Sequence, residues 1–390
     1  MIIGIPKESL REEKRVALTP AGAHALARAG HTIIAQAEAG EGSGFSAEAY
    51  REAGGDIAFS AEEVFARADL IVKLMPPTRE ECSWIPEQRF LFSAVHMGAV
   101  NSRVHEMLRE RGTTAIGIEL IEDDDHTLPV LTAMSEIAGM LLPQIAGRFL
   151  ETARGGRGIL LGGVAGIPPS HVVIIGAGNV GATAARMFLG AGASVTVMDE
   201  NLRRLRFVDQ QLQKRVTTAL ATPYNIERFV VSADVVAGAV LIHGRKAPHV
   251  VTESMVRAMK PGSVIIDVSI DQGGCVETSR PTTLSDPIFA RHGVTHFCVP
   301  NIPSSVARTA SHAFSNTGPD LFDPGWSYRD MGDCWTEIEI KHFGCFISFH
   351  TIHLHGSDIT PGLEQSGHKI RLPDCLSIET VFCFIGVLTL

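Results

Sequence analysis

The chain has 390 residues, which is long for one domain and makes two domains the natural expectation. Hydrophobic residues at 45% and charged residues at 20% are typical of a soluble globular protein. The formal net charge of -9 argues against nucleic acid or an anionic membrane as the main partner, since both attract a basic face. No signal peptide and no apolar run approaching roughly 18 residues is recognised, so we expect a cytoplasmic protein with no membrane partner.

The first third of the chain alternates short apolar runs with helical stretches. Thr19 is expected to cap a helix that begins at Pro20. Strands that alternate with helices at this spacing predict parallel βαβ units. The expected strands cover residues 2–5, 31–36, 69–75 and 90–95.

A second α/β set follows a change of pattern near residue 130. One long helix is expected over 134–150, followed by a glycine-rich stretch over 154–166. The later strands are expected at 172–175, 194–198, 235–240 and 264–268. The predicted fold class is α/β, with two Rossmann-like domains built on doubly wound parallel sheets and an active-site cleft between them.

The sharpest motif is a glycine-rich turn that follows a strand and opens a helix, with glycines at Gly176, Gly178 and Gly181. These glycines permit a tight turn, close approach of a pyrophosphate and close packing of the helix on the sheet. Asp199 ends the next strand, where a carboxylate accepts hydrogen bonds from ribose hydroxyls and repels a 2′-phosphate. The motif therefore predicts a dinucleotide site that favours NAD over NADP, although Arg203 places a cation nearby.

Two more loops follow strand ends of the same predicted sheet. Ligands of such sheets bind beyond the carboxyl ends of the strands. The first loop contains Val240 and Leu241, and the second covers residues 269–274. We expect both loops to lie beside the cofactor.

With this glycine turn and these loops, the sequence resembles the NAD-dependent L-alanine dehydrogenases, a family related to the nucleotide-binding subunit of proton-translocating transhydrogenase. The resemblance is nearly continuous to about Asn316, and its segment 277–283 separates the dehydrogenases from the transhydrogenases. The other matching segments are 3–8, 15–20, 134–139, 155–158 and 270–275.

The resemblance implies a substrate domain built from both ends of the chain, around a central Rossmann domain. Residues 1–130 would form the first segment of the substrate domain, 131–305 the NAD-binding domain, and 306–317 the return to the substrate domain. The family resemblance also implies a homohexamer.

Catalytic roles follow from the resemblance one position at a time. Arg15 matches the arginine that clamps the substrate carboxylate, a task suited to a planar bidentate donor. His96 matches the general acid/base, and Asp271 matches the carboxylate that orients ammonia or water. Each position also has a structural alternative: a surface cation, a satisfied structural histidine and a loop-capping aspartate.

Further positions match contacts of the cofactor and substrate. Ser135 matches a contact to the cofactor phosphates, although it could equally be a helix N-cap. Asn301 matches an active-site amide beside the nicotinamide. Cys275 is better explained as a packing residue than as a nucleophile, because this chemistry needs no covalent intermediate.

One active-site position departs from the family pattern. The family usually has a substrate-binding lysine where this chain has Met75. Because strand side chains alternate, Lys73 and Met75 are expected on one face, which would let Lys73 compensate from about 6–7 Å further back. Loss of a cation at the reacting carbonyl could cost several kcal/mol of transition-state stabilisation.

The second departure covers residues 318–390, which show no regular apolar period. We expect this tail to be poorly ordered or loosely docked, and to lack the helices that would complete the substrate domain. Its cluster of Cys345, His350, His353 and His355 could in principle bind zinc, but nothing organises the surrounding chain and no metal is predicted.

Three functional hypotheses remain open from the sequence. The first is a dehydrogenase that converts L-alanine reversibly to pyruvate and ammonia with NAD, without a nucleic-acid or membrane partner. The second is a non-catalytic NAD(H)-binding homologue. The third is a dehydrogenase for a different small amino or 2-oxo acid whose pocket tolerates Met75.

Overall fold

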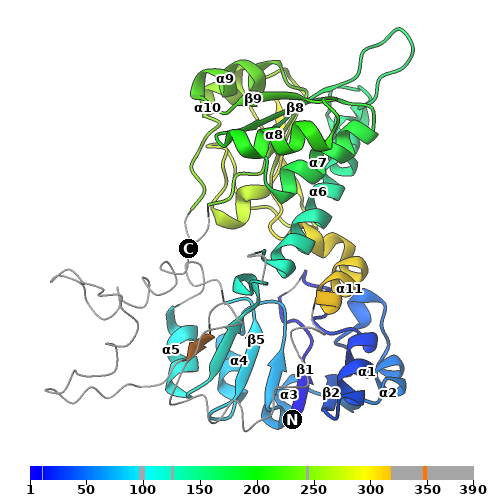
Figure 1. The fold of residues 1–390 in the computed structure, drawn as a ribbon, viewed down its shortest axis with the longest axis vertical. Helices are drawn as coiled ribbons and strands as arrows, with labels where there is room; N and C mark the ends of the chain where they lie inside the picture. Colours follow the sequence, from blue (N-terminus) through cyan, green and yellow to red (C-terminus); the bar gives the residue numbers. More distant parts are fainter. Residues whose placement is uncertain (11, 96–101, 124–126, 243–245, 318–345, 349–390) are drawn as a thin grey trace, which may run out of the picture.

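A computed structural model describes the chain except for residues 11, 96–101, 124–126, 243–245, 318–345 and 349–390. Two sheets lie one above the other along the long axis of the molecule, each with helices on its faces (Figure 1). The helices α6 (Pro129–Leu150) and α11 (Ala307–Thr317) lie between the two sheets. The predicted α/β fold class with two doubly wound sheets is confirmed.

The first sheet has the strand order β14-β6-β5-β4-β1-β2-β3. All its neighbouring pairs are parallel except β14 with β6. The chain therefore builds outward from β1 in one direction and then from β4 in the other, which makes the β1/β4 boundary a topological switch point. The strands are β1 (Ile2–Ile5), β2 (Thr32–Gln36), β3 (Asp56–Ala58), β4 (Leu70–Val72), β5 (Phe90–Ser93), β6 (Thr114–Gly117) and β14 (Phe346–Ser348).

The second sheet repeats this plan with the order β12-β13-β11-β10-β7-β8-β9. Its pairs are parallel except for the terminal pair of β12 and β13, and its switch point lies between β7 and β10. The strands are β7 (His171–Ile175), β8 (Ser194–Asp199), β9 (Thr217–Leu220), β10 (Val235–Gly238), β11 (Val264–Asp267), β12 (Ile288–Arg291) and β13 (Val294–Phe297).

Short helices connect successive strands, as expected for parallel βαβ units. Thr19 caps α1 as predicted, since its side chain accepts a hydrogen bond from Gly22 N. Around the first sheet lie α1 (Pro20–Arg28), η1 (Glu41–Ser43), α2 (Ala47–Glu52), α3 (Ala61–Arg67), α4 (Arg79–Trp84), α5 (Ser102–Glu110) and η2 (Ile118–Leu120). Around the second lie η3 (Thr152–Arg154), α7 (Asn179–Gly190), α8 (Leu202–Gln211), α9 (Pro223–Ser232), α10 (Glu253–Ala258), η4 (Val268–Gln272) and η5 (Ile302–Val306).

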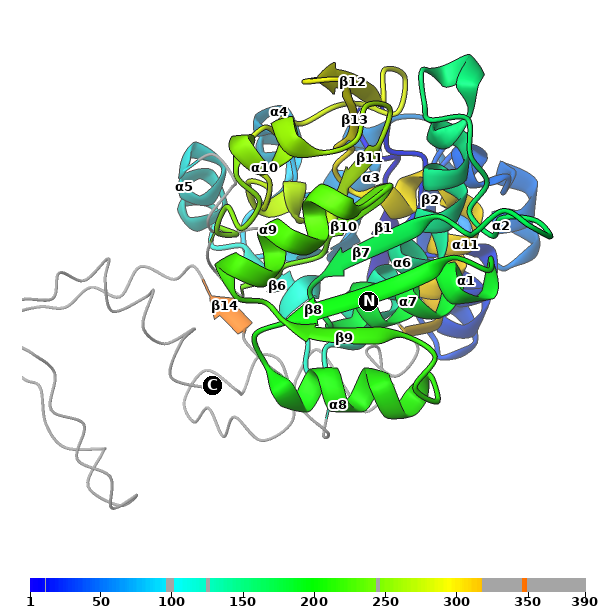
Figure 2. The same cartoon turned by 90° about the horizontal axis from the view of Figure 1, so that it is seen from above.

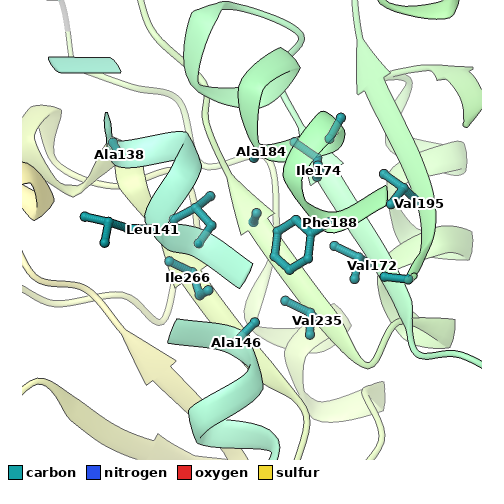
Figure 3. Packing of buried hydrophobic residues seen from close by; sticks show 14 of the residues in the cluster. Ala138, Leu141, Ala146, Val172, Ile174, Ala184, Phe188, Val195, Val235 and Ile266 are labelled. Carbon is teal, nitrogen blue, oxygen red and sulfur yellow. The ribbon is translucent and has the colours of Figure 1, made fainter. Parts of the chain in front are cut away.

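Strand residues of the second sheet alternate between two apolar layers. Val172 and Ile174 face the layer that contains α6, α7 and α8, whereas Val173 and Ile175 face α9 and α10. Figure 2 shows these helices arranged around the sheet, and Figure 3 shows Phe188 of α7 among the strand side chains. Both faces of the sheet are thus covered, which explains the continuous apolar runs in its strands.

Helix α6 is longer than the sequence predicted, since it begins at Pro129 rather than at residue 134. Proline suits this first helical position because its missing N–H would have no helical partner there. Among the described residues, α6 is the one helix that is long and apolar enough to cross a membrane. Its Leu141, Leu142 and Phe149 lie in the core against the second sheet, and this packing accounts for its apolar composition.

Helix α11 returns the chain to the first sheet. Ser311 Oγ accepts a hydrogen bond from Val16 N at 2.9 Å, and Ser315 Oγ lies 3.0 Å from Thr19 Oγ1. Both serines are buried. These polar contacts fix the segment that leads from β1 to α1, and that segment carries several of the site residues described below.

Most of the 318–390 segment, including the zinc candidates Cys345, His350, His353 and His355, lies outside the described residues. Its described part is β14, which pairs with β6 at the edge of the first sheet. The expectations about order and zinc binding in the remainder stay predictions.

Gly139 makes the packing of α6 on α7 testable. A Cβ at this position would lie 2.7 Å from the Val180 carbonyl oxygen, whereas a Cβ at Gly147 on the same helix would meet its nearest atom at 3.6 Å. We expect Gly139→Ala to lower the free energy of unfolding by about 1–3 kcal/mol, because the backbone of α7 must move. Urea unfolding monitored by circular dichroism measures the change.

Gly147→Ala is the matched control, and we expect it to be neutral or to stabilise by up to about 1 kcal/mol through helix propensity. Equal effects of the two substitutions would contradict this account of the α6–α7 contact.

Candidate active site

The glycine-rich turn between β7 and α7 has the geometry of a phosphate-binding loop. Gly176 has φ 110°, and a Cβ there would lie 2.2 Å from the Ala239 carbonyl oxygen. A Cβ at Gly181 would lie 1.8 Å from the Gly176 carbonyl oxygen. A Cβ at Gly178 would instead meet no atom within 4 Å, and this residue begins α7 without a side-chain cap. The turn thus leaves open space at the N-terminus of a long helix, which fits a pyrophosphate.

Asp199 lies at the end of β8 and bonds to the same turn. Its Oδ2 accepts a hydrogen bond from Ala177 N and its Oδ1 accepts one from Asn201 N, both at 2.7 Å. Arg204 Nη1 is 3.8 Å from Oδ2. A carboxylate has about four acceptor positions, so these two bonds leave capacity for ribose hydroxyls. Asp199 therefore has an anchoring role that the sequence did not predict.

Helix α6 crosses the start of α7 beside this turn. Asn179 Nδ2 donates to Thr132 Oγ1 at 3.0 Å, and Gly139 packs against Val180. Ser135 lies between Thr132 and Gly139 at helical spacing, and so on the face of α6 that approaches α7. The alternative that Ser135 is a helix N-cap is wrong, because the helix begins six residues earlier.

The loop after β10 lies against the glycine turn at the switch point. Ala239 N donates to the Ile175 carbonyl oxygen at 2.8 Å, and Ala239 is the residue that a side chain at Gly176 would strike. The next two residues are Val240, which packs partly on the core, and Leu241, which is exposed. The predicted cofactor residues Val240 and Leu241 thus lie beside the predicted phosphate loop.

Arg15 lies at the junction of the two sheets and is already paired. Its Nε and Nη2 donate to the two carboxylate oxygens of Glu13 at 2.8 and 2.7 Å. Both side chains are at most 5% exposed. Its Nη1 lies 3.5 Å from Met134 Sδ and its Nη2 lies 4.0 Å from Met75 Sδ. Arg15 is therefore not the surface cation that was its structural alternative.

Glu13 also binds a residue from the second sheet. Asn301 Nδ2 donates to Glu13 Oε2 at 2.8 Å, and Asn301 N donates to Asp271 Oδ1 at 3.0 Å. Asn301 has φ 56° and ψ 50°, a left-handed conformation in which asparagine is among the more tolerant residues. We call this hydrogen-bonded chain of Arg15, Glu13, Asn301 and Asp271 the junction chain. It brings three predicted site residues together.

A neighbouring carboxylate makes a second contact between the same regions. Glu12 Oε2 accepts a hydrogen bond from Leu284 N at 2.7 Å, and Oε1 accepts one from Ser285 N at 3.0 Å. The loop after β1 is thus held to the second sheet at two consecutive residues.

The expectation that Lys73 and Met75 share a face is wrong. Strand β4 ends at Val72, three residues before the predicted end, so strand alternation does not extend to Met75. Lys73 is fully buried, with Nζ 2.8 Å from Glu81 Oε1 and over the Phe65 ring. Met75 packs instead on the opposite apolar layer, beside Arg15. Lys73 therefore does not compensate for Met75 in this arrangement.

His96 lies outside the described residues, and its role stays a prediction. The chain that leads to it is anchored, since Val95 N donates to Glu119 Oε1 at 3.0 Å. Among the described residues, no group of three or more His, Cys, Asp or Glu side chains could hold a metal ion.

Two buried carboxylates that the sequence analysis missed hold site loops. Asp267 accepts hydrogen bonds from Ser269 N, Cys275 N and Val276 N, which folds the loop that carries Asp271. Burial raises the pKa of Asp267 and, more strongly, the pKa of the Cys275 thiol. Cys275 is thus an unreactive packing residue.

Glu8 is the second of these carboxylates. It accepts hydrogen bonds from Leu74 N and Met75 N and lies 3.8 Å from Lys73 Nζ. No motif singles out Glu8, whose partners are distant in sequence, or Glu13, which binds both the nearby Arg15 and the distant Asn301. The matching segment 3–8 ends at Glu8 and is the one signal that could have indicated it.

Glu8 predicts a pH dependence of stability. Burial raises the pKa of its carboxyl from 4.5 to about 6, against the opposing effects of Lys73 and the Leu74 N–H. The folded protein therefore binds the proton more tightly than the unfolded chain, and this stabilisation is present below pH 4.5 and is lost as the pH rises through 6. Between these limits we expect the wild type to lose roughly 2 kcal/mol relative to Glu8→Gln.

Urea unfolding between pH 4.5 and 7 measures this difference. The control is Glu48→Gln, which removes an exposed carboxylate paired with Arg51 and should follow the wild type. A difference between wild type and Glu8→Gln that stays constant over the range would contradict the assignment.

Comparisons with known proteins identify relatives of both halves of the chain. The family model for the alanine dehydrogenase/PNT N-terminal domain matches residues 4–138, and the model for the C-terminal domain matches residues 143–323. An alanine dehydrogenase of Methanococcus maripaludis is 44% identical over 81% of this chain and 85% of its own length. An alanine dehydrogenase of Mycobacterium tuberculosis is 44% identical over 84% of this chain and 89% of its own length.

Solved structures agree with these matches. An L-alanine dehydrogenase superposes with a TM-score of 0.79 at 42% identity, covering 82% of this chain and 88% of that chain. A transhydrogenase from Sinorhizobium meliloti superposes with a TM-score of 0.73 at 23% identity, covering 83% and 92%, which shows a shared fold alone. The chain belongs to the alanine dehydrogenase/PNT family, and it is a dehydrogenase with a Rossmann-like domain for a nicotinamide cofactor.

Proposed function

We propose that this dehydrogenase interconverts L-alanine with pyruvate and ammonia, using NAD(H) and water. The relatives named alanine dehydrogenase support the substrate class. The observation that carries the proposal is the junction chain, which joins Arg15 of the first sheet to Asn301 and Asp271 of the second. Arg15, which would bind the substrate carboxylate, thereby lies next to residues that follow the strands of the nucleotide-binding sheet.

The proposed roles follow the chemistry of each side chain. Arg15 binds the substrate carboxylate through its guanidinium. His96 transfers the proton at the substrate nitrogen or oxygen, and Asp271 orients ammonia or water by accepting their hydrogen bonds. The nicotinamide cofactor, when bound, accepts or returns the hydride at C2.

The cofactor residues are proposed from their places around the glycine turn. Gly176, Gly178 and Gly181 shape the turn, and the free N–H groups at the start of α7 suit phosphate oxygens. Asp199 would accept the ribose hydroxyls and disfavour a 2′-phosphate, which supports NAD rather than NADP. Ser135, Val240 and Leu241 complete the set, as described above.

A different small amino or 2-oxo acid is the second candidate substrate. It is favoured by Met75, whose thioether lies 4.0 Å from Arg15 Nη2 at the position where the family resemblance predicts a lysine. The non-catalytic NAD(H)-binding homologue is the outcome if no substrate of either kind turns over.

The remaining proposals concern the domain boundaries, the oligomeric state and the cellular compartment of the enzyme. Residues 1–130 with 306–317 would form the substrate domain, and 131–305 the NAD-binding domain. The family resemblance supports a homohexamer. The described thiols Cys82, Cys275 and Cys298 are buried and free, which fits a reducing compartment such as the cytoplasm.

Asp199→Asn tests the choice of cofactor. The amide removes the negative charge and keeps one acceptor, for the N–H of either Ala177 or Asn201 but not for both. We expect NADH affinity to fall by about 10-fold or more, the effect of losing a charged hydrogen bond, and NADPH to be discriminated against less strongly. Fluorescence titration gives both dissociation constants.

Asp199→Ala should weaken NADH binding further, because the turn also loses its anchor. Glu227→Gln, an exposed change on α9, controls for net charge. Unchanged affinities for both cofactors in the Asp199 variants would refute the assignment.

Met75→Lys tests the reaction and the identity of the substrate. NADH oxidation is measured with pyruvate plus ammonia and, in parallel, with a panel of other 2-oxo acids. If the missing cation limits turnover, Met75→Lys should raise the pyruvate rate by about 10-fold or more, since one well-placed donor contributes roughly 10²–10³ to kcat. His96→Ala should abolish activity in either background.

Met75→Leu is the matched control, because it removes the thioether without adding charge. A Met75→Lys protein that is no faster with pyruvate, while the wild type turns over another 2-oxo acid, would favour the second candidate substrate.

A further inference from the structure

The loop between β1 and α1 has little backbone structure of its own. It covers residues 6–19 and carries both Glu13 and Arg15. Among its described residues, one backbone–backbone hydrogen bond lies within the loop, from Glu13 N to the Leu10 carbonyl oxygen at 3.0 Å. Because Glu13 and Arg15 belong to the same loop, their mutual bonds do not fix that loop to the first sheet. Side chains from other segments are needed to hold it in place.

Two buried serines bind the peptide groups on either side of Arg15. Ser43 Oγ donates to the Lys14 carbonyl oxygen at 2.9 Å, and Ser311 Oγ accepts a hydrogen bond from Val16 N at 2.9 Å. The two hydroxyl oxygens lie 2.8 Å apart. Both serines are nearly inaccessible to water, so these bonds are shielded from competition by solvent.

The direction of these bonds follows from the number of protons available. A serine hydroxyl has one proton to donate. Because Ser43 donates its proton to Lys14, it is Ser311 that donates to Ser43 Oγ. The bonds thus run in one direction, from the Val16 N–H through the two hydroxyls to the Lys14 carbonyl oxygen, and each proton has an acceptor. We call this arrangement the serine chain.

Helix α11 also holds the short helix η1, which carries Ser43. Arg308 lies one turn before Ser311 on α11, and its Nη1 donates to the carbonyl oxygens of Ser43 and Gly44 at 3.0 and 2.9 Å. The Arg308 guanidinium also lies over the Phe45 ring, 4.5 Å from its centroid. One helix thus places both hydroxyls of the serine chain.

Fixing both peptide groups of Arg15 fixes the point and the direction from which its side chain extends. A guanidinium binds a carboxylate bidentately only when two donors lie in the correct geometry. A side chain that is already held in place loses less conformational freedom when a ligand binds than one that must first be ordered. The serine chain is therefore expected to strengthen binding of a carboxylate to Arg15.

We infer that Ser311 and Ser43 are positioning residues for Arg15, which hold its guanidinium in place for the carboxylate of either the amino acid or the 2-oxo acid. This inference rests on the proposed function, in which Arg15 binds that carboxylate in both directions of the reaction. The carboxylate is not changed by the reaction, so the serine chain stabilises the bound substrate and the transition state equally.

Modification of Arg15 by phenylglyoxal tests the position of its guanidinium without any turnover. The reagent condenses with two nitrogens of one guanidinium, and peptide mass spectrometry gives the rate at each arginine. Arg15 is 5% exposed and should react slowly in the wild type. Ser311→Ala leaves the Val16 N–H without an acceptor, and we expect the rate at Arg15 to rise about tenfold. The exposed Arg51 is the internal reference.

Ser315→Ala is the matched control. Ser315 lies one turn after Ser311 on α11, is also buried, and accepts a hydrogen bond from Thr19 N at 3.3 Å. The control variant therefore also leaves a buried N–H unpaired, but at the cap of α1 rather than beside Arg15. We expect it to leave the rate at Arg15 unchanged. An unchanged rate in Ser311→Ala, or the same rise in Ser315→Ala, would overturn the inference.

Steady-state kinetics gives a second measurement, with ammonia, NADH and the 2-oxo acid that the wild type reduces. We expect Ser311→Ala and Ser43→Ala each to raise the KM of the 2-oxo acid about tenfold and to leave kcat unchanged, as for loss of uniform binding. The dissociation constant of NADH should also stay unchanged. The double variant should raise KM little more than either single variant, because both serines act in one chain. A fall in kcat at unchanged KM would contradict the inference.

Failure of the proposed function is separate from failure of this inference. It appears as no NADH oxidation by the wild type with pyruvate or any other 2-oxo acid, whereas the phenylglyoxal rates still show whether the serine chain positions Arg15. If Ser311→Ala does not fold, Ser43→Ala provides the same measurement from the other end of the serine chain.

Discussion

The buried ion pair between Arg15 and Glu13 is the constraint on which the site depends. Removing two charges from water is costly, and their attraction offsets this cost only with good geometry and further hydrogen bonds. Here the pair is bidentate, and Asn301 supplies an additional donor. The pair consequently requires the loop after β1 and the loop after β13 to be held together, although they are distant in sequence.

Much of the fold could be predicted from the sequence because its signals are local. The glycine turn was recognised since each glycine answers a steric need within that turn, and the structure shows those close contacts at Gly176 and Gly181. The parallel sheets could be predicted from apolar runs separated by helical stretches. In the structure, Val172 and Val173 pack into apolar layers on opposite faces of the sheet, so successive strand positions are apolar. The cap at Thr19 could also be predicted, because a helix cap depends on neighbouring residues in the sequence.

The site was less predictable because its contacts join distant segments. Glu13 and Asn301 are 288 residues apart, and no spacing pattern connects them. The shared face expected of Lys73 and Met75 assumed a strand that continued, whereas β4 ends at Val72 and Met75 packs on the layer opposite to that of Lys73. Asp199 was expected to face a ligand, yet both its oxygens also bond to backbone N–H groups that shape the loop.

The paired bonds of Glu12 and Glu13 have a consequence for access to the site. Any motion that separates the loop after β1 from the second sheet must break the bonds to Leu284, Ser285 and Asn301. At roughly 1–2 kcal/mol for each bond, the separated form is a minor population. The rate of any ligand exchange that needs this separation would therefore depend on how often the hydrogen bonds of Glu12 and Glu13 to the second sheet's loops break at the same time.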